Sequence, residues 1–524
     1  MQTIKKSFCL ILVLVMCLGV FAGCNNTPAN NDPKDTDDGT ATTAGDENGG
    51  DDDTTAGDDD STATENPKER IDLLDEYIFE GKTQEFIILS RATTAYEFES
   101  PTGELAGVEQ AIFDRNAEVA ERCHIEISIV PQAGTWDDRD SFIATLRTNS
   151  LLPVSQYDLV STHQSYLATA TLDGYGWDFT KLDNIDVNKA WWSEVYYNEC
   201  NYNGAIYMMY GDIAYTLYEY LQVFFFNEQV AEDLSIEDLY DLAIDGDWTF
   251  AKLKEYTAKA TTNLDLAEED REYGLLTGAH ANRAFGTSFY CELAPLNAEG
   301  VRAFHNPSLS TDVAERMQAV VDFVVETPQV LCDMTYTTAA DALNPVFSAG
   351  RSLFYAQMLG QASYFTENMK EAYGVLPYPK YNENQAKYRT EVCDEVSAVM
   401  APRNCKLPTM TGTVAEMMSM ISYFDVITVY YGEKLQYQYF NNPKCVQSLN
   451  IIRSSFAPSF TMVYSYPLNF INSMLPGAVG STVSTGSSVA VDGSYKTALG
   501  TARKLLRDIF LDLDKIAAKD AAAQ

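Results

Sequence analysis

A tyrosine-rich stretch around one acidic residue has the side chains best suited to binding chemistry. Eight tyrosines fall between Tyr196 and Tyr220, they flank Gly211 and Asp212, and an apolar run typical of a strand follows at Leu221–Phe226. Aromatic rings with polar tips around a carboxylate suit a surface that binds a ligand with both apolar and hydroxylated parts. The alternative is a packed strand whose tyrosine hydroxyls point to water. The rest of the sequence has to decide between the two.

Enzymatic chemistry has little support in the sequence. It contains no Gly-x-Ser-x-Gly elbow, no His-Glu-x-x-His pair, no phosphate-binding Gly-Lys-Ser/Thr loop and no Gly-x-Gly-x-x-Gly turn. The four histidines are not spaced with one another for metal binding; they are His124, His163, His280 and His305. With 75 acidic residues, no pair can be singled out as the carboxylates of a glycosidase. The sequence therefore predicts no catalytic residue, no cofactor and no metal site.

Length and charge limit the class of protein further. A chain of 524 residues exceeds what one hydrophobic core normally serves, so two or more lobes are expected. The formal net charge of −39 disfavours nucleic acid and anionic lipid as partners, because their phosphates would repel the chain.

The N-terminus has the pattern of a secretion signal. Lys5 and Lys6 precede an apolar run, Phe8–Gly19, that is too short for a comfortable membrane span. Phe21–Gly23 directly before Cys24 resembles a bacterial lipobox. We predict that residues 1–23 are a lipoprotein signal peptide and that Cys24 carries the lipid anchor, at the extracellular face of the cytoplasmic membrane. A plain secretory signal with an incidental cysteine is the alternative.

Residues 24–67 are rich in Asp, Thr, Gly, Ala and Asn, with almost no large apolar side chain. Such a segment cannot bury enough surface to offset its chain entropy, so we predict a disordered acidic tether. The body beyond it contains seven cysteines, and no pair has the Cys-x-x-Cys spacing. An odd number without such a pair predicts neither a zinc ribbon nor a disulfide framework, although one or two disulfides remain open.

The folded part begins with an alternation of strands and helices. The expected elements are strands at 84–89, 124–130 and 157–160 and helices at 108–123 and 141–148. This order is typical of a parallel α/β sheet with right-handed crossovers. Ligands of such sheets bind at loops after the strands, which here are Ser90–Arg91, Gln132–Trp136 and Ser161–Ser165. His163 and Gln164 in the last loop either contact a ligand or cap the loop.

The second half has a less regular pattern. Residues 272–305 are mixed, and a strand is expected at Val396–Ala401. Helices are expected at Phe250–Lys259, Thr311–Glu326, Thr411–Gly432 and Thr497–Ile516. Residues 477–494, rich in Ser, Gly, Val and Thr, are expected to form a loop.

A series of short motifs occurs in a recognisable order. It consists of Tyr157-Asp158-Leu159-Val160, Asn203-Gly204 with Tyr207, Gly211-Asp212, Phe225-Phe226-Asn227, Asp238-Leu239-Tyr240-Asp241, Gly246-Asp247-Trp248-Thr249, Phe347-Ser348-Ala349-Gly350 and Leu376-Pro377-Tyr378-Pro379-Lys380. With the lipobox and tether, this order resembles the family 1 extracellular solute-binding proteins, the sugar-binding lipoproteins of Gram-positive ABC importers. The resemblance runs from Gln84 to the last helix and rests on order and spacing, not on any single motif.

The resemblance implies a type II periplasmic-binding-protein fold, in which two α/β lobes are joined by a hinge and the ligand cleft lies between them. The implied divisions are 68–214 for the first part of lobe 1, 215–372 for lobe 2, 373–432 for the return to lobe 1, and 433–524 for C-terminal helices mainly on lobe 2. The strand at Tyr373–Lys380 is expected to carry the chain back to lobe 1. Gly204, Gly211 and Gly374 are available for the hinge.

The resemblance also implies a carbohydrate ligand, a monosaccharide or an oligosaccharide. A monomeric protein is expected to deliver this ligand to ABC-importer permease subunits. Aromatic rings cover the faces of a sugar, and polar side chains bind its hydroxyls. The expected ligand-binding residues are Asp212, Tyr210, Tyr215, Thr162, His163, Gln164, Arg91, Trp136, Tyr355 and Gln357. Asp212 is expected to accept two hydroxyls, whereas Trp191, Trp192 and Trp248 are expected to pack in the core. A surface glycan-binding module without a transporter, or a binding protein for a peptide or another solute, are the alternatives.

Overall fold

The computed structural model describes residues 79–99, 105–260, 265–267, 270–298, 300–334, 340–440 and 442–523. The predicted signal peptide, the acidic tether and the anchor residue Cys24 lie outside the described residues. Within the described ranges, no helix has both the length and the apolar character needed to cross a membrane.

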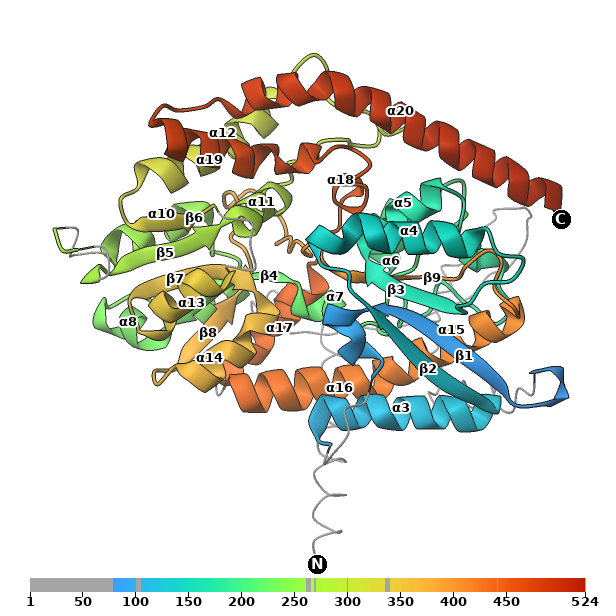
Figure 1. The fold of residues 1–524 in the computed structure, drawn as a ribbon. Helices are drawn as coiled ribbons and strands as arrows, with labels where there is room; N and C mark the ends of the chain where they lie inside the picture. Colours follow the sequence, from blue (N-terminus) through green and yellow to red (C-terminus); the bar gives the residue numbers. More distant parts are fainter. Residues whose placement is uncertain are drawn as a thin grey trace, which may run out of the picture. The chain divides into compact units, whose positions relative to one another are not determined.

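The first sheet forms around β1 (Gln84–Arg91), and its strand order is β2-β1-β3-β9 (Figure 1). β2 (Ile125–Gln132) and β3 (Leu159–His163) run parallel to β1, and β9 (Ser397–Met400) runs antiparallel to β3. The crossover helices are α3 (Gly107–Cys123) and α4 (Arg139–Ser150). The predicted strand–helix–strand alternation is confirmed, but the third strand begins two residues later than expected and extends to His163.

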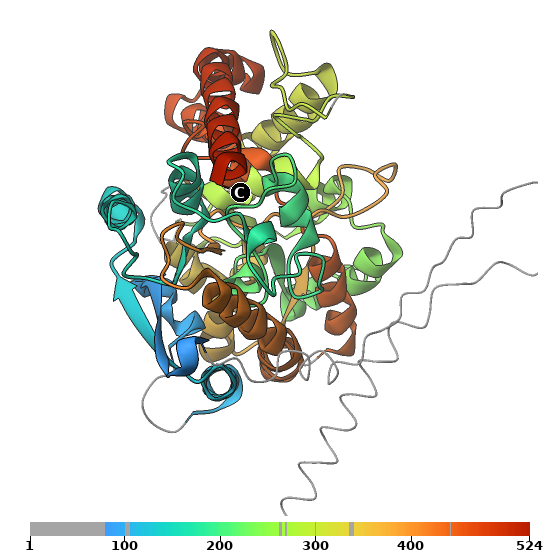
Figure 2. The same ribbon diagram turned by 90° about the vertical axis from the view of Figure 1, so that its right-hand side faces the viewer.

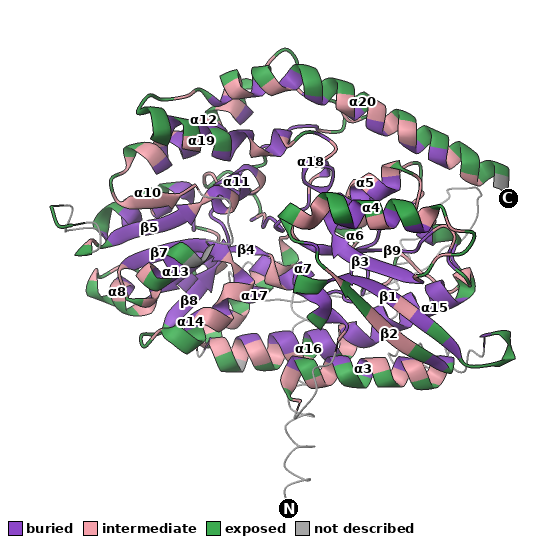
Figure 3. Ribbon diagram, in the orientation of Figure 1, coloured by how far each residue is buried: buried purple, intermediate pink, exposed green. Residues whose placement is uncertain are grey.

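The second sheet has the order β6-β5-β7-β4-β8. Its strands are β4 (Gln222–Asn227), β5 (Tyr273–Gly278), β6 (Val330–Asp333), β7 (Ser352–Met358) and β8 (Tyr373–Leu376). β5 is parallel to β6 and β7, whereas β4 is antiparallel to both β7 and β8. Every residue of β4 is buried, because helices cover both faces of this sheet (Figure 3). We refer to each sheet with the helices packed on it as the first and the second lobe.

The other helices of the first half are η1 (Phe79–Gly81), η2 (Ala92–Glu97), η3 (Trp136–Asp138), α5 (Gln164–Leu172), η4 (Phe179–Lys181), α6 (Glu194–Cys200), α7 (Thr216–Glu219), α8 (Glu228–Asp233), α9 (Leu239–Asp245) and α10 (Phe250–Lys259). Those of the second half are α11 (Ala279–Ser288), α12 (Thr311–Glu326), α13 (Ala340–Ser348), η6 (Leu359–Gln361), α14 (Ala362–Asn368), α15 (Pro408–Ile421), η7 (Ser422–Val426), α16 (Ile427–Val429), η8 (Tyr430–Tyr439), α17 (Pro443–Ser454), α18 (Phe460–Val463), η9 (Ile471–Ser473), α19 (Met474–Thr485) and α20 (Val491–Ala523).

Two chain segments connect the lobes and lie against each other. The first runs from Met209, which pairs with Val399 beside the first sheet, to β4 in the second sheet. The second runs from β8 to β9, and we call residues 391–396 of it the linking segment. The backbone N–H of Gln222 donates to Glu391 O at 2.9 Å, and that of Cys393 donates to Tyr220 O at 2.8 Å. The predicted strand at 373–380 begins as β8, which pairs with β4 in the second sheet, and the chain that follows it enters the first sheet at β9.

The C-terminal helices contact both lobes. The expected loop at 477–494 is wrong, because α19 covers residues up to Thr485 and α20 begins at Val491. One end of α20 is fixed to the second lobe, where Asp492 accepts the N–H of Leu309 at 3.0 Å. Near its other end, Asp520 accepts the hydroxyl of Tyr207 at 2.9 Å and pairs with Arg403. Figure 2 views this helix nearly end-on, with its C-terminal end toward the reader.

Gly374 in β8 is required for space. A Cβ at this position would lie 2.3 Å from both Phe226 Cε1 and the Tyr240 hydroxyl, so we expect Gly374→Ala to lower the free energy of unfolding by about 1–3 kcal/mol. Gly432→Ala is the matched control, since nothing lies within 4 Å of its Cβ. Urea unfolding of both variants tests this, and equal midpoints would contradict it. Gly374 lies inside a paired strand, and a hinge role for it stays a prediction.

Candidate functional site

The carboxyl ends of two parallel strands bring polar side chains together next to the linking segment. β1 ends at Arg91 and β3 ends at His163, and the pairing of Ser90 with Ser161 puts both ends at the same edge of the first sheet. Arg91 is buried, and its Nη2 donates to Glu395 O in the linking segment at 2.7 Å. The Arg91 Nε is also buried and has no hydrogen-bond partner within the described part of the chain. Arg91 therefore has donor capacity left at this edge.

His163 lies at a point where a strand passes directly into a helix. The expected loop at 161–165 is wrong, because β3 extends through His163 and α5 begins at Gln164. The Nδ1 of His163 accepts the N–H of Ser165 at 3.1 Å, so this side chain caps α5. Its ring stacks on Tyr166 at 4.7 Å. Burial, with a smaller contribution from the Arg91 cation, lowers the pKa of His163 to about 3, so the imidazole is neutral.

The neighbours of His163 are buried as well. The Gln164 Oε1 accepts the hydroxyl of Tyr210 at 3.1 Å, and its Nε2 is buried without a partner among the described residues. Thr162 Oγ1 is also buried and has no hydrogen-bond partner among the described residues. The structure thus brings Tyr210, Thr162, His163, Gln164 and Arg91 to one end of the first sheet.

An exposed aromatic surface lies beside this group. Trp136 is 42% exposed, and its ring centroid lies 5.9 Å from that of His163 and 6.1 Å from that of Tyr466. Phe470 packs edge-on at 5.5 Å, and the Arg139 guanidinium lies 4.4 Å from the Trp136 ring centroid. A partly exposed ring held in place by its neighbours suits contact with an apolar ligand face.

Three further predicted residues lie elsewhere. Asp212 is buried, and its Oδ1 already accepts the hydroxyl of Tyr218 at 2.5 Å, so this oxygen is engaged within the protein. The reason is that its tyrosine neighbours fold inward as core residues. Burial raises the pKa of Asp212 to about 7. Tyr355 and Gln357 in β7 are buried and bonded to each other, with Gln357 Nε2 donating to the Tyr355 hydroxyl at 3.0 Å. The packing role expected for Trp191, Trp192 and Trp248 is confirmed, since all three are buried.

The second lobe contributes a charged group that the sequence analysis missed. Arg283 in α11 donates from Nε to Glu391 Oε1 at 3.1 Å and from Nη2 to Asp394 Oδ1 at 2.8 Å. His280, one turn earlier in α11, lies against Asp394. Residues 272–305, which include this part of α11, have a mixed sequence pattern. The apolar run Tyr273–Thr277 before Gly278 nevertheless indicates a strand. The strand-end rule would then have placed the first turn of α11 at the site.

An open cleft of about 1380 Å³ lies between the lobes. One side consists of η2, α3 and β2 of the first lobe, and the other includes Met358, Gly360 and Ser363 of the second. Tyr215 and Tyr220 of the first crossing line it as well. Of the predicted ligand-binding residues, Tyr215 is therefore at the cleft. Tyr220 is also the neighbour of the linking segment described above, whereas Arg91, Trp136 and residues 162–164 do not line this cleft.

Solved structures with a similar fold include two binding proteins of ABC transporters and a receptor. An ABC substrate-binding protein from Listeria monocytogenes in complex with cycloalternan covers 81% of this chain and 99% of its own, with 12% sequence identity and a TM-score of 0.53. A solute-binding protein from Thermotoga lettingae bound with alpha-D-tagatose covers 81% of this chain and 100% of its own, with 13% sequence identity and a TM-score of 0.51. The GacH receptor of Streptomyces glaucescens, solved unliganded and in complex with acarbose, gives 81%, 99%, 12% and 0.53 for the same quantities.

At these identities the similarity defines the fold. The predicted class, a mixed α/β protein of the periplasmic-binding-protein type, is confirmed. No protein-family model matches the sequence, and no curated protein matches it.

Proposed function

We propose that this protein is the extracellular carbohydrate-binding component of an ABC importer. It captures a monosaccharide or an oligosaccharide between its lobes, the lobes close, and the closed form delivers the solute to a permease. A diacylglycerol group on Cys24 and the acidic tether hold it at the outer face of the cytoplasmic membrane. It has no catalytic role in this proposal.

The observation that carries the proposal is the combination of Trp136 with the buried polar group at the ends of β1 and β3. A partly exposed indole supports stacking on the C–H face of a sugar. Arg91, Thr162 and Gln164 carry buried nitrogen or oxygen atoms that have no partner among the described residues, which supports hydrogen bonds from these atoms to ligand hydroxyls. The proteins of the same fold cited above were solved with cycloalternan, tagatose and acarbose.

A thermal-shift screen tests the ligand class. The purified protein is heated with plant and host glycans, with peptides and with polyamines. A rise in Tm with one or more carbohydrates supports the proposal, because a ligand that binds only the folded state stabilises it. Shifts with peptides or polyamines alone would overturn the sugar assignment. Small-angle scattering with the hit then separates a closing importer component from an open glycan-binding module, which would keep its dimensions.

Trp136→Ala is expected to weaken binding of the carbohydrate found in that screen by about two- to tenfold, because a stacked ring contributes about 0.5–1.5 kcal/mol. Isothermal titration measures the change. Leu511→Ala is the control, since Leu511 is also exposed, at 49%, but lies on α20. Equal affinities for the two variants would exclude Trp136 from the site.

A further inference from the structure

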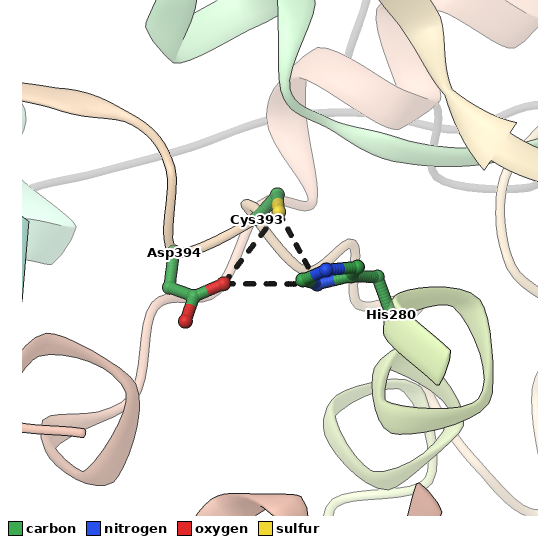
Figure 4. Close-up of side chains that lie close together, drawn as sticks. All are labelled: His280, Cys393 and Asp394. Atoms are coloured by element: carbon green, nitrogen blue, oxygen red, sulfur yellow. Dashed lines mark hydrogen bonds and ion pairs between the residues drawn. The ribbon is translucent and has the colours of Figure 1, made fainter. Parts of the chain in front are cut away.

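Three side chains of different chemistry form a small triangle where α11 meets the linking segment (Figure 4). The Cys393 Sγ lies 3.7 Å from His280 Nδ1 and 3.6 Å from Asp394 Oδ1, and His280 Nδ1 lies 3.8 Å from Asp394 Oδ1. Figure 4 shows the three groups converging from two chain segments that are more than a hundred residues apart in sequence. Neither binding of a sugar nor the packing of the core requires this combination.

The triangle has the dimensions of one face of a zinc tetrahedron. Zinc binds Cys sulfur at about 2.3 Å, His nitrogen at about 2.0–2.1 Å and carboxylate oxygen at about 2.0–2.2 Å. Tetrahedral angles then separate the donor atoms by about 3.4–3.6 Å. The three observed separations are at most a few tenths of an ångström longer, so a cation can be bound with small side-chain movements.

We propose that His280, Cys393 and Asp394 bind one Zn²⁺ ion. Three protein ligands leave a fourth position for water or for an oxygen atom of a solute, as in zinc sites with an open coordination position. That position has access to solvent, because the side chains of His280 and Asp394 are 31% and 13% exposed. Binding replaces the thiol proton of Cys393, which leaves to solvent, by a sulfur–zinc bond.

The surroundings suit a divalent cation in charge and in geometry. Arg283 Nη2 donates to Asp394 Oδ1 at 2.8 Å and lies 3.9 Å from Cys393 Sγ, so one guanidinium group orients two of the three proposed ligands. With Cys393 as thiolate, three negative groups face the single positive charge of Arg283. A Zn²⁺ ion brings the sum to zero.

The proposed ion connects the second lobe to the linking segment. His280 belongs to α11 of the second lobe, whereas Cys393 and Asp394 belong to the segment that leads back to β9. Zinc would therefore hold these parts together beside the site at the ends of β1 and β3. This inference does not depend on the identity of the solute, and it holds even if the ligand is not a carbohydrate.

Cobalt and zinc titrations of the purified full-length protein test the proposal. After treatment with a chelator, we expect one Co²⁺ per chain, with the near-ultraviolet absorption of a thiolate–cobalt bond and the visible bands of tetrahedral coordination. Zn²⁺ should displace the cobalt stoichiometrically. Cys393→Ser should abolish the thiolate band, and His280→Asn should weaken Zn²⁺ binding by about tenfold or more in isothermal titration.

His124→Asn is the matched control, because His124 is exposed, lies far along the chain from the site and has a left-handed backbone conformation that Asn tolerates. It should bind cobalt and zinc as the unchanged protein does. Circular dichroism and thermal unfolding establish that each variant is folded. The proposal is overturned if the unchanged protein binds no stoichiometric metal. It is also overturned if a folded Cys393→Ser variant keeps the thiolate band.

Discussion

Replacing Arg283 with methionine is expected to lower the free energy of unfolding by about 3–5 kcal/mol. The side chain is 7% exposed and bonds to two carboxylates, Glu391 and Asp394, whose side chains are 3% and 13% exposed. Removing the guanidinium leaves two negative charges in a poorly hydrated place between α11 and the linking segment. Urea unfolding, followed by both tryptophan fluorescence and circular dichroism, measures the loss.

Lys504→Met is the control for this variant. Lys504 pairs with Asp508 on the surface of α20, and the two side chains are 68% and 38% exposed, so its loss should cost less than about 1 kcal/mol. The double variant Arg283→Met with Glu391→Gln should regain part of the lost stability, because one uncompensated charge is removed. If Arg283→Met and Lys504→Met unfolded at the same urea concentration, the prediction would be wrong, because the buried ion pairs of Arg283 would then add no more to the free energy of unfolding than a surface pair does.

The second large effect concerns pH. Burial raises the pKa of both Glu97 and Asp212 to about 7. Glu97 Oε1 accepts the N–H of Thr216 at 2.9 Å, so both carboxyl groups act on the first crossing between the lobes. A raised pKa means that the folded state holds the proton more tightly than the unfolded state does. The contribution of each protonated carboxyl group to the free energy of unfolding is largest below its unfolded-state pKa, near 4. This contribution is lost as the pH rises through the folded-state pKa of about 7.

Each group is therefore expected to reduce the free energy of unfolding by about 2–3 kcal/mol between pH 5 and pH 8. Asp212→Asn keeps a neutral side chain at all pH values. As the pH is raised from 5 to 8, the free energy of unfolding of this variant should rise by about 2–3 kcal/mol relative to that of the unchanged protein. Glu97→Gln should behave in the same way.

Chemical denaturation at a series of pH values provides the measurement. Asp512→Asn is the comparison, because Asp512 is a surface residue of α20 that pairs with Lys515. Parallel stability curves for Asp212→Asn and the unchanged protein would show that Asp212 has an ordinary pKa in the folded state, and would contradict the prediction.

The elements with the clearest periodicity could be predicted from the sequence. The helices expected at 250–259 and 311–326 match α10 and α12 to the residue, because each has one apolar face and a capping Thr or Ser directly before it. The strand at 84–89 is as clear, and its apolar side chains Phe86, Ile88 and Leu89 are buried. Residues 477–494 were misjudged because their composition is typical of loops, while contacts with α11 and α12 stabilise α19 as a helix.

The site was predicted in part. The strand-end rule located Arg91, Trp136 and His163, because the order of strands and helices alone determines which loops share an edge of a parallel sheet. It could not foresee that β3 continues through His163, since a polar strand end and a loop have the same residue types. The aromatic density around Asp212 suggested a binding surface, yet the tyrosines there pack into the core. Residue type does not say which face of a segment is covered.

By itself the sequence determined an α/β protein of two lobes and a polar edge on the first sheet. Local periodicity and the order of elements carry that information. Only the tertiary structure decided which distant residues meet. His280 shows no metal-ligand spacing with any neighbour in sequence, yet the packing of α11 on the linking segment places it 3.7 Å from Cys393. The same packing determines that Arg283 neutralises two buried carboxylates, because contacts between segments depend on the fold as a whole.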